Sequence, residues 1–283
     1  MRVLVSAFLA VVASCSSGGE RRAAEQLVER SPWSDTLPER SPSAEGGRDI
    51  FEALAGLSLE DRELRIESEI EDGNVPDVLR RGFRVELEGR SANRTSHVLE
   101  FVVLPDYLAI GSNDDFVRVP LTPMTASRIA EGHGFVLPTP KLVDAIHAAA
   151  GLKLEPQPLV ENREAAPTFV LHDDLVRKQL GGRGGWFLVS GVKKDVVVTP
   201  SSIEQPGRVA IYGWHRPEGR PIQPLYLGHS ATYVDYSHGV LLVRSRARLD
   251  GDEVDLRDVL ADESLSWIVS EEGPMRGSND RSE

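Results

Sequence analysis

The stretch "YVDYSHGVLLV", residues 233–243, begins with polar side chains and ends in an unbroken apolar run. Successive side chains of a regular strand point to opposite faces, so the run from Val240 to Val243 is apolar on both faces. A strand of that kind lies in the interior of a sheet rather than at its surface. We therefore predict an interior strand here.

Three polar residues stand where this strand enters the core, next to Gly239: Asp235, Ser237 and His238. Ser237 and His238 are adjacent, so on a regular strand they point to opposite faces and cannot form a nucleophile–base pair with each other. His238 is better placed to act with His215 or His229, because both belong to strands predicted to lie nearby.

Charged residues interrupt an apolar strand at 185–200, "GWFLVSGVKKDVVVTP". Gly191 permits a bend that brings Lys193, Lys194 and Asp195 together. Burying such charges costs several kcal/mol unless they are paired, and the simplest interpretation is a Lys–Asp pair at a sheet edge.

The next strand, "RVAIYGWH" at 208–215, ends in a histidine. Regular alternation places Tyr212 and Trp214 on one face as an aromatic pair, and Gly213 leaves a gap on the other face where a ligand could reach the backbone. A hairpin turn, "RPEGRP", then predicts an antiparallel return that brings back His229.

Three interpretations of these groups stay open. In the first, His215 and His238 form an acid–base pair, with Asp235 or Asp195 orienting one ring and Ser237 nearby. In the second, the three histidines and Asp235 bind a metal, although separations of fourteen and nine residues match no zinc signature. In the third, the histidines are structural and the protein is a binding module. The expected ligand-binding residues are Lys193, Lys194, Asp195, Tyr212, Trp214, His229 and Tyr236. No metal or cofactor is expected.

The amino-terminal residues indicate export. A short basic start is followed by the apolar run Val3–Ala13, which is too short to span a bilayer but suits a secretory signal. It ends in Val12-Ala13-Ser14-Cys15, which resembles the bacterial lipobox. That resemblance implies cleavage after residue 14 and lipidation of Cys15, the only cysteine of the 283 residues. Several acyl chains would hold the protein at a membrane. Ser16 does not resemble a signal for retention at the inner membrane, so we expect the outer membrane or cell surface of a bacterial envelope.

Composition excludes several classes of protein. A single cysteine excludes a disulfide framework and a cysteine-rich metal site. The net charge of −12, without a basic stripe, argues against nucleic acid as a partner. Residues 15–47 are rich in Ser, Gly, Pro, Glu and Arg and predict a disordered tether.

The expected fold is α+β: a mainly antiparallel sheet with an N-terminal helical layer and a central helix pair. Ser58 predicts the start of one helix, and Thr122-Pro123 and Thr139-Pro140 predict the starts of the pair. "TFVL" at 168–171 predicts a short strand before a helix. We expect one domain over 48–273, with a lobe boundary allowed near 151–168 and a disordered tail over 274–283.

A short motif resembles that of a known enzyme family. Ser237-His238-Gly239 is similar to the start of the Ser-His-Gly-Cys-x-Arg motif of L,D-transpeptidases, exported enzymes that cross-link peptidoglycan. Val240 stands at the position of the nucleophilic cysteine and Leu242 at that of the arginine, so the family's chemistry cannot run here. The motifs "YGWH", "PIQPL" and "DYSHG" also resemble those of uncharacterised bacterial secreted proteins.

These observations together predict a surface-tethered lipoprotein that hydrolyses a cell-envelope or extracellular polymer through histidine acid–base chemistry. The alternative is a non-catalytic lipoprotein that binds a polymeric or small-molecule envelope ligand. An enzyme requires His215 and His238 to converge on a shared cleft, whereas a binding module requires only an aromatic platform.

Overall fold

The computed structural model describes residues 28–183 and 187–275. The signal sequence, the lipobox with Cys15 and the last eight residues lie outside the described residues, so those expectations stay predictions. No helix within the described ranges is long and apolar enough to cross a membrane.

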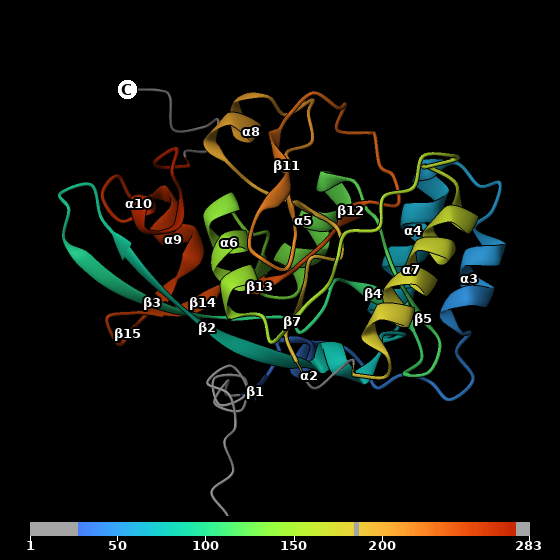
Figure 1. The fold of residues 1–283 in the computed structure, drawn as a ribbon. Coiled ribbons are helices and arrows are strands. Elements are labelled where there is room, and N and C mark those ends of the chain that lie inside the picture. The colour runs from blue at the N-terminus through green and yellow to red at the C-terminus, as the bar shows by residue number, and fades with distance from the viewer. Residues whose placement is uncertain (1–27, 184–186, 276–283) are drawn as a thin grey trace, which may run out of the picture.

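Two sheets form the β part of the fold (Figure 1). The larger is entirely antiparallel and contains β1 (Val28–Arg30), β2 (Arg81–Arg90), β3 (Ser96–Val103), β13 (Val243–Arg244) and β6 (Phe135–Val136) in that order, with β14 (Arg246–Leu249) and β15 (Asp252–Asp255) joined through β3. The smaller runs in the order β11 (Pro221–Tyr226), β10 (Ile211–His215), β9 (Lys194–Val196) and β12 (His238–Gly239). Only the β9–β12 pairing within it is parallel.

Two short strand pairs complete the β structure. An antiparallel pair joins β4 (Ala109–Gly111) to β5 (Phe116–Arg118), and a parallel pair joins β7 (Leu152–Lys153) to β8 (Val189–Ser190). Because helices and strands are both abundant and antiparallel pairing dominates the sheets, the predicted α+β class is confirmed.

The helices cover the sheets in two groups (Figure 1). The first group packs together around β4 and β5 and consists of α3 (Gly47–Ala53), α4 (Leu59–Glu71) and α7 (Ala166–Leu180). The second covers the larger sheet and includes α6 (Pro140–Ala149), α9 (Leu256–Ala261) and α10 (Ser266–Val269). The remaining helices are α2 (Trp33–Thr36), the 3₁₀ helix η1 (Asp77–Arg80), α5 (Pro123–Gly132) and α8 (Pro200–Glu204).

Hydroxyl caps start the central helix pair as the sequence predicts. Thr122 accepts a hydrogen bond from the amide of Thr125 at the start of α5, and Thr139 accepts one from Leu142 at the start of α6. Ser58 caps α4 in the same way. Each cap satisfies an amide that the first helical turn leaves without an intrahelical partner.

The stretch 233–243 forms two strands rather than one. Residues 238–239 pair with β9 in the smaller sheet, and residues 243–244 pair with β3 and β6 in the larger sheet. Between them the carbonyls of Val240 and Leu242 accept hydrogen bonds from the amides of Leu108 and Leu104, at 2.8 and 3.0 Å. The apolar run therefore lies in the interior, as predicted, but it does so as a buried connection that joins the two sheets.

Gly239 is where this connection leaves no room for a side chain. A Cβ atom there would lie 2.5 Å from the ring of Tyr107 and 2.7 Å from the Cβ of Lys193, both of which are buried. We predict that Gly239→Ala lowers the free energy of unfolding by about 1–3 kcal/mol, because neither neighbour can move freely. Gly132→Ala is the matched control, since nothing lies within 4 Å of its added methyl. Equal urea midpoints for the two variants would contradict this assignment.

Two segments differ from their predicted structure: part of the predicted tether is ordered, and the predicted strand at 168–171 is helical. Within the predicted tether, residues 28–30 pair with β2, and Trp33 is fully buried against Phe135, with ring centroids 5.6 Å apart. Burial of Trp33 and Leu37, together with hydrogen bonds from Arg80 to the carbonyls of both residues, helps to offset the ordering of a segment that is otherwise polar. The predicted strand at 168–171 is also wrong, because these residues belong to α7. Tertiary packing of Phe169 against Phe51 overrides the local preference for a strand.

Helices α9 and α10 are separated by a break at Asp262. The carboxylate of Asp262 accepts hydrogen bonds from the amides of Ser264 and Leu265, at 2.8 and 2.7 Å, which starts a new turn. Such local bonding by aspartate competes with helix continuation.

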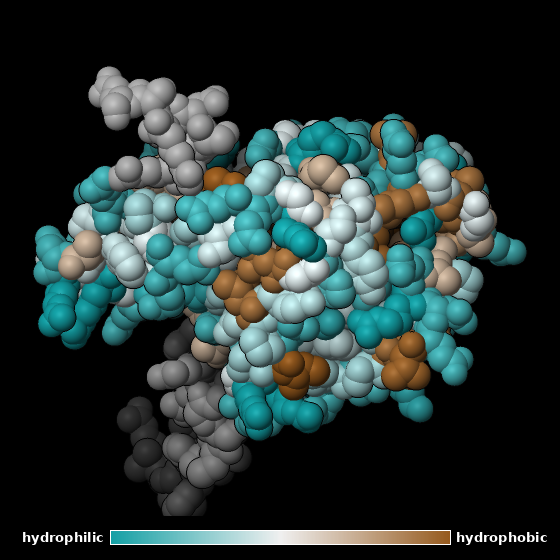
Figure 2. Space-filling view, turned by 90° about the horizontal axis from the view of Figure 1, so that it is seen from above, coloured by the Kyte–Doolittle hydropathy of each residue, from teal (hydrophilic) through white to brown (hydrophobic). Residues whose placement is uncertain are grey.

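Seen from above, hydrophilic side chains cover most of the molecule, and hydrophobic ones gather in separate patches (Figure 2).

Candidate functional site

The structure divides the predicted site residues into two groups on opposite sides of β9. His215 lies on β10 and His238 on β12, and both strands pair with β9. Adjacent strands are about 4.8 Å apart, so the two backbones are separated by about 10 Å. The rings of His215 and His238 make no contact with each other among the described residues. The expected acid–base pair is therefore not formed.

The first group surrounds His215, which is buried. Its Nε2 atom lies 2.8 Å from Oδ1 of Asp144, and the hydroxyl of Tyr212 donates to the same oxygen at 2.9 Å. The ring of His147 stacks on that of His215 with centroids 4.5 Å apart. Asp144 thus orients His215, in the place expected for Asp235 or Asp195. His147 is buried rather than solvated, and burial lowers its pKa to about 4.

A β-bulge changes the faces of β10. The register with β11 shifts between Ile211 and Gly213, and both Gly213 and Trp214 have positive φ angles, 92° and 51°. Trp214 consequently packs in the same apolar cluster as Ile211, while Tyr212 packs in another cluster. The predicted aromatic pair on one face is therefore wrong, because regular alternation stops at the bulge.

The space beside Gly213 is filled. A Cβ atom there would lie 3.0 Å from Oδ2 of Asp195, 3.2 Å from Val143 and 3.3 Å from Cε1 of His215. The expected gap for a ligand is thus occupied by the protein's own side chains.

The second group surrounds His238, which is fully buried. Neither of its ring nitrogens has a hydrogen-bond partner among the described residues. The ring centroids of Tyr233 and His229 lie 5.7 and 6.4 Å away, and these two rings stack on each other at 4.3 Å. Burial lowers the pKa of His238 to about 4, so its imidazole is neutral at pH 7.

Asp235 holds the polar end of the stretch in place. Its carboxylate accepts hydrogen bonds from the amide and hydroxyl of Ser237, at 2.8 and 2.6 Å. It also accepts from the hydroxyl of Tyr233 at 2.9 Å and forms an ion pair with Arg163 at 2.7 Å. Ser237 is thus committed to Asp235 and is not bonded to a histidine base. The hydroxyl of Tyr236 bonds the backbone of Leu159, which indicates a structural residue.

The charged residues of β9 do not form the predicted Lys–Asp pair, and β9 lies inside its sheet rather than at an edge. The buried ammonium of Lys193 donates to the carbonyl oxygen of Tyr236, and burial lowers the pKa of Lys193 to about 7. Lys194 lies half-buried with its Nζ atom 5.7 Å from the ring centroid of Trp214. Oδ1 of the buried Asp195 has no partner among the described residues, and burial raises the pKa of Asp195 to about 8.

Sequence reasoning missed several polar residues that contribute to these groups. Asp144, which is exposed, and the buried His147 lie on α6, and the buried His172 lies on α7 with its ring 4.9 Å from that of Tyr236. The i, i+3 spacing of Asp144 and His147 puts both on one helix face, and this was the available signal. Within the described ranges, no three His, Cys, Asp or Glu side chains are arranged to hold a metal ion.

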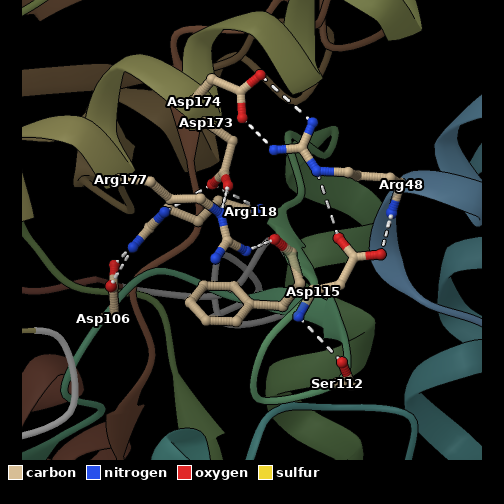
Figure 3. A network of polar contacts seen from close by, with 9 residues as sticks. Arg48, Asp106, Ser112, Asp115, Arg118, Asp173, Asp174 and Arg177 are labelled. Atoms are coloured by element: carbon tan, nitrogen blue, oxygen red, sulfur yellow. Dashed lines mark hydrogen bonds and ion pairs between the residues drawn. The ribbon is translucent and has the colours of Figure 1, made fainter. Parts of the chain in front are cut away.

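A further buried network lies between α7 and β5 (Figure 3). The guanidinium of Arg118 is fully buried and makes ion pairs of 2.6 Å with both Asp106 and Asp173. Asp173 also pairs with Arg177 at 2.6 Å. Every charge here has a partner, which is the arrangement expected of a structural network.

Searches against protein-family models, curated proteins and solved structures find no match for this chain.

Proposed function

We propose that the protein is an envelope-anchored lipoprotein that binds an acidic group of a cell-envelope polymer without cleaving it. The observation that carries this proposal is the separation of His215 and His238 by β9. A hydrolase that uses both histidines would need them within hydrogen-bond reach of one bond. Anchoring through Cys15 is part of the proposal and rests on the lipobox resemblance.

The binding surface that we propose lies in front of His238 and is formed by Lys194, His229 and Tyr233, here called the His229 surface. Lys194 is close enough to His229 and His238 to contribute to lowering the pKa of both rings. The ring of His238 is fully buried, so a ligand at this surface would contact Lys194, His229 and Tyr233, which are partly exposed. A carboxylate or phosphate oxygen would supply a counter-charge for Lys194.

Binding can be measured by calorimetric titration of the purified protein with soluble peptidoglycan fragments. We expect Lys194→Met and His229→Ala each to weaken binding about tenfold, which corresponds to about 1.4 kcal/mol for one charge-assisted contact. Lys178→Met is the matched control, because Lys178 is exposed on α7, a helix that contributes no residue to the His229 surface. Unchanged affinity in both site variants would refute this surface.

The same fragments allow a test for cleavage. Under the proposal, incubation with the wild-type protein releases no new products that mass spectrometry can detect. If products appear and a folded His238→Ala variant no longer makes them, the protein is a hydrolase and the binding proposal fails.

A further inference from the structure

A cavity of about 1040 Å³ lies away from both histidine groups. It is bounded by the closed end of the β2–β3 hairpin, the start of α6 and helix α10. Figure 1 shows this hairpin extending beside α9 and α10. None of its lining residues belongs to the His229 surface, so it is a separate place on the molecule.

The walls of this cavity are fixed by contacts outside it. The amide of Ala92 in the hairpin turn donates to the carbonyl of Ser264 at 2.9 Å. Gly89 packs directly on Ile268, since a Cβ atom there would lie 2.7 Å from that side chain. Lys141 donates to the carbonyl of Trp267 at 2.8 Å and pairs with Glu271 at 2.9 Å. The cavity is therefore largely formed before any ligand arrives.

One aromatic ring lines the cavity. Trp267 is 38% exposed, which is unusual for so large an apolar side chain, and part of its indole is covered by Gly273. Exposed indoles that line a hollow offer a flat apolar surface on which a ring-shaped ligand can stack. Trp267 therefore favours a ligand with a flat or ring-shaped apolar face.

Two guanidinium groups set the charge of the ligand. Arg90 and Arg94 both line the cavity, and their exposed guanidinium groups make no ion pair within the described chain. Lys141, the lysine of this cavity, is already paired with Glu271. Glu88 is the remaining carboxylate of the lining, so the two guanidinium groups exceed it in charge, and they line the same cavity as the exposed indole of Trp267. Guanidinium groups bind carboxylates and phosphates with paired hydrogen bonds.

We propose that this cavity binds a sugar ring that carries an acidic group, with the ring stacked on Trp267 and the acidic group held by Arg90 and Arg94. Ser96 also lines the cavity, and its hydroxyl is suited to bonding a sugar hydroxyl. The proposal concerns a site distinct from the His229 surface and does not depend on it.

The test compares two probes of equal length on the full protein: a trisaccharide of galacturonic acid and the neutral trisaccharide of galactose. We expect the acidic probe to bind at least about tenfold more tightly at low salt, and this preference to shrink as salt is added. Trp267→Ala should weaken binding of both probes, whereas Arg90→Gln with Arg94→Gln should remove only the preference for the acidic one.

Two controls separate this site from others. Trp267→Phe retains a flat ring and should retain most of the affinity, and Lys178→Met, an exposed position on α7 that does not line the cavity, should leave the binding of both trisaccharides unchanged. Equal affinity of the two probes, no binding of either at millimolar concentration, or unaltered binding by Trp267→Ala would each overturn the proposal. Thermal unfolding of each variant verifies that the fold is intact.

Discussion

Replacing Arg118 by methionine should lower the free energy of unfolding by about 3–5 kcal/mol. The methionine fills similar space, but it leaves the carboxylates of Asp106 and Asp173 buried without their main cation. A buried charge without a partner is among the most costly changes that a single substitution can make. Urea denaturation at pH 7, followed by circular dichroism, gives the free energy directly.

Two comparisons make that result specific to the buried network. Arg48→Met removes an ion pair with Asp174 in which both side chains are 45% exposed, and it should cost less than about 1 kcal/mol. Adding Asp106→Asn and Asp173→Asn to Arg118→Met removes the unpaired charges and should recover part of the loss. If Arg118→Met and Arg48→Met are equally mild, the network contributes little to stability.

Replacing Asp195 by asparagine should stabilise the protein above neutral pH. Burial raises the pKa of Asp195 to about 8, whereas an aspartate in the unfolded chain titrates near pH 4. Between these values the native state keeps a proton that the unfolded state has lost. The unfolding free energy of the wild type therefore falls as pH rises through this window. Asparagine cannot ionise, so the variant does not share this fall.

The measurement is the difference in unfolding free energy between Asp195→Asn and wild type across pH 4 to pH 9. It should be small near pH 4 and reach about 2 kcal/mol or more in favour of the variant near pH 8. The variant is compared with the wild type at each pH because other buried groups change the unfolding free energy in the opposite direction. Lys193, with a pKa of about 7, favours the native state as pH rises above 7, and His238 does so between about pH 4 and its unfolded value near 6.5. A difference that is constant with pH would show that Asp195 is ionised in the native protein.

The parts of the fold that were predictable have local causes. Thr122 and Thr139 bond amides three residues away, so their role as helix caps can be inferred from the adjacent sequence. The α+β class follows in the same way from changes of hydrophobic period along the chain. The interior position of residues 240–243 was predictable because both faces of that run are apolar.

The parts that were missed depend on distant contacts. Trp33 is buried only because Phe135 and His133 lie beside it, about a hundred residues away, and nothing in its polar surroundings indicates that. Asp144 reaches His215 from a helix 71 positions earlier in the sequence. Alternation cannot foresee the bulge at Gly213, because a glycine is compatible with regular and with left-handed backbone alike. Since the bulge reverses the faces of Trp214 and His215, the predicted faces of both residues are wrong.

The edge strand β11 has a consequence for the association of one molecule with another. An open sheet edge can recruit a strand from a second molecule, which is a common route to aggregation. Pro221 and Pro224 occupy two of the six positions of β11, and proline has no amide hydrogen to donate to a new neighbour. Ile222 and Tyr226 are both partly exposed on this strand, so the edge would otherwise favour pairing with another strand. The two prolines therefore hinder this edge of the smaller sheet from pairing with a second copy of the protein.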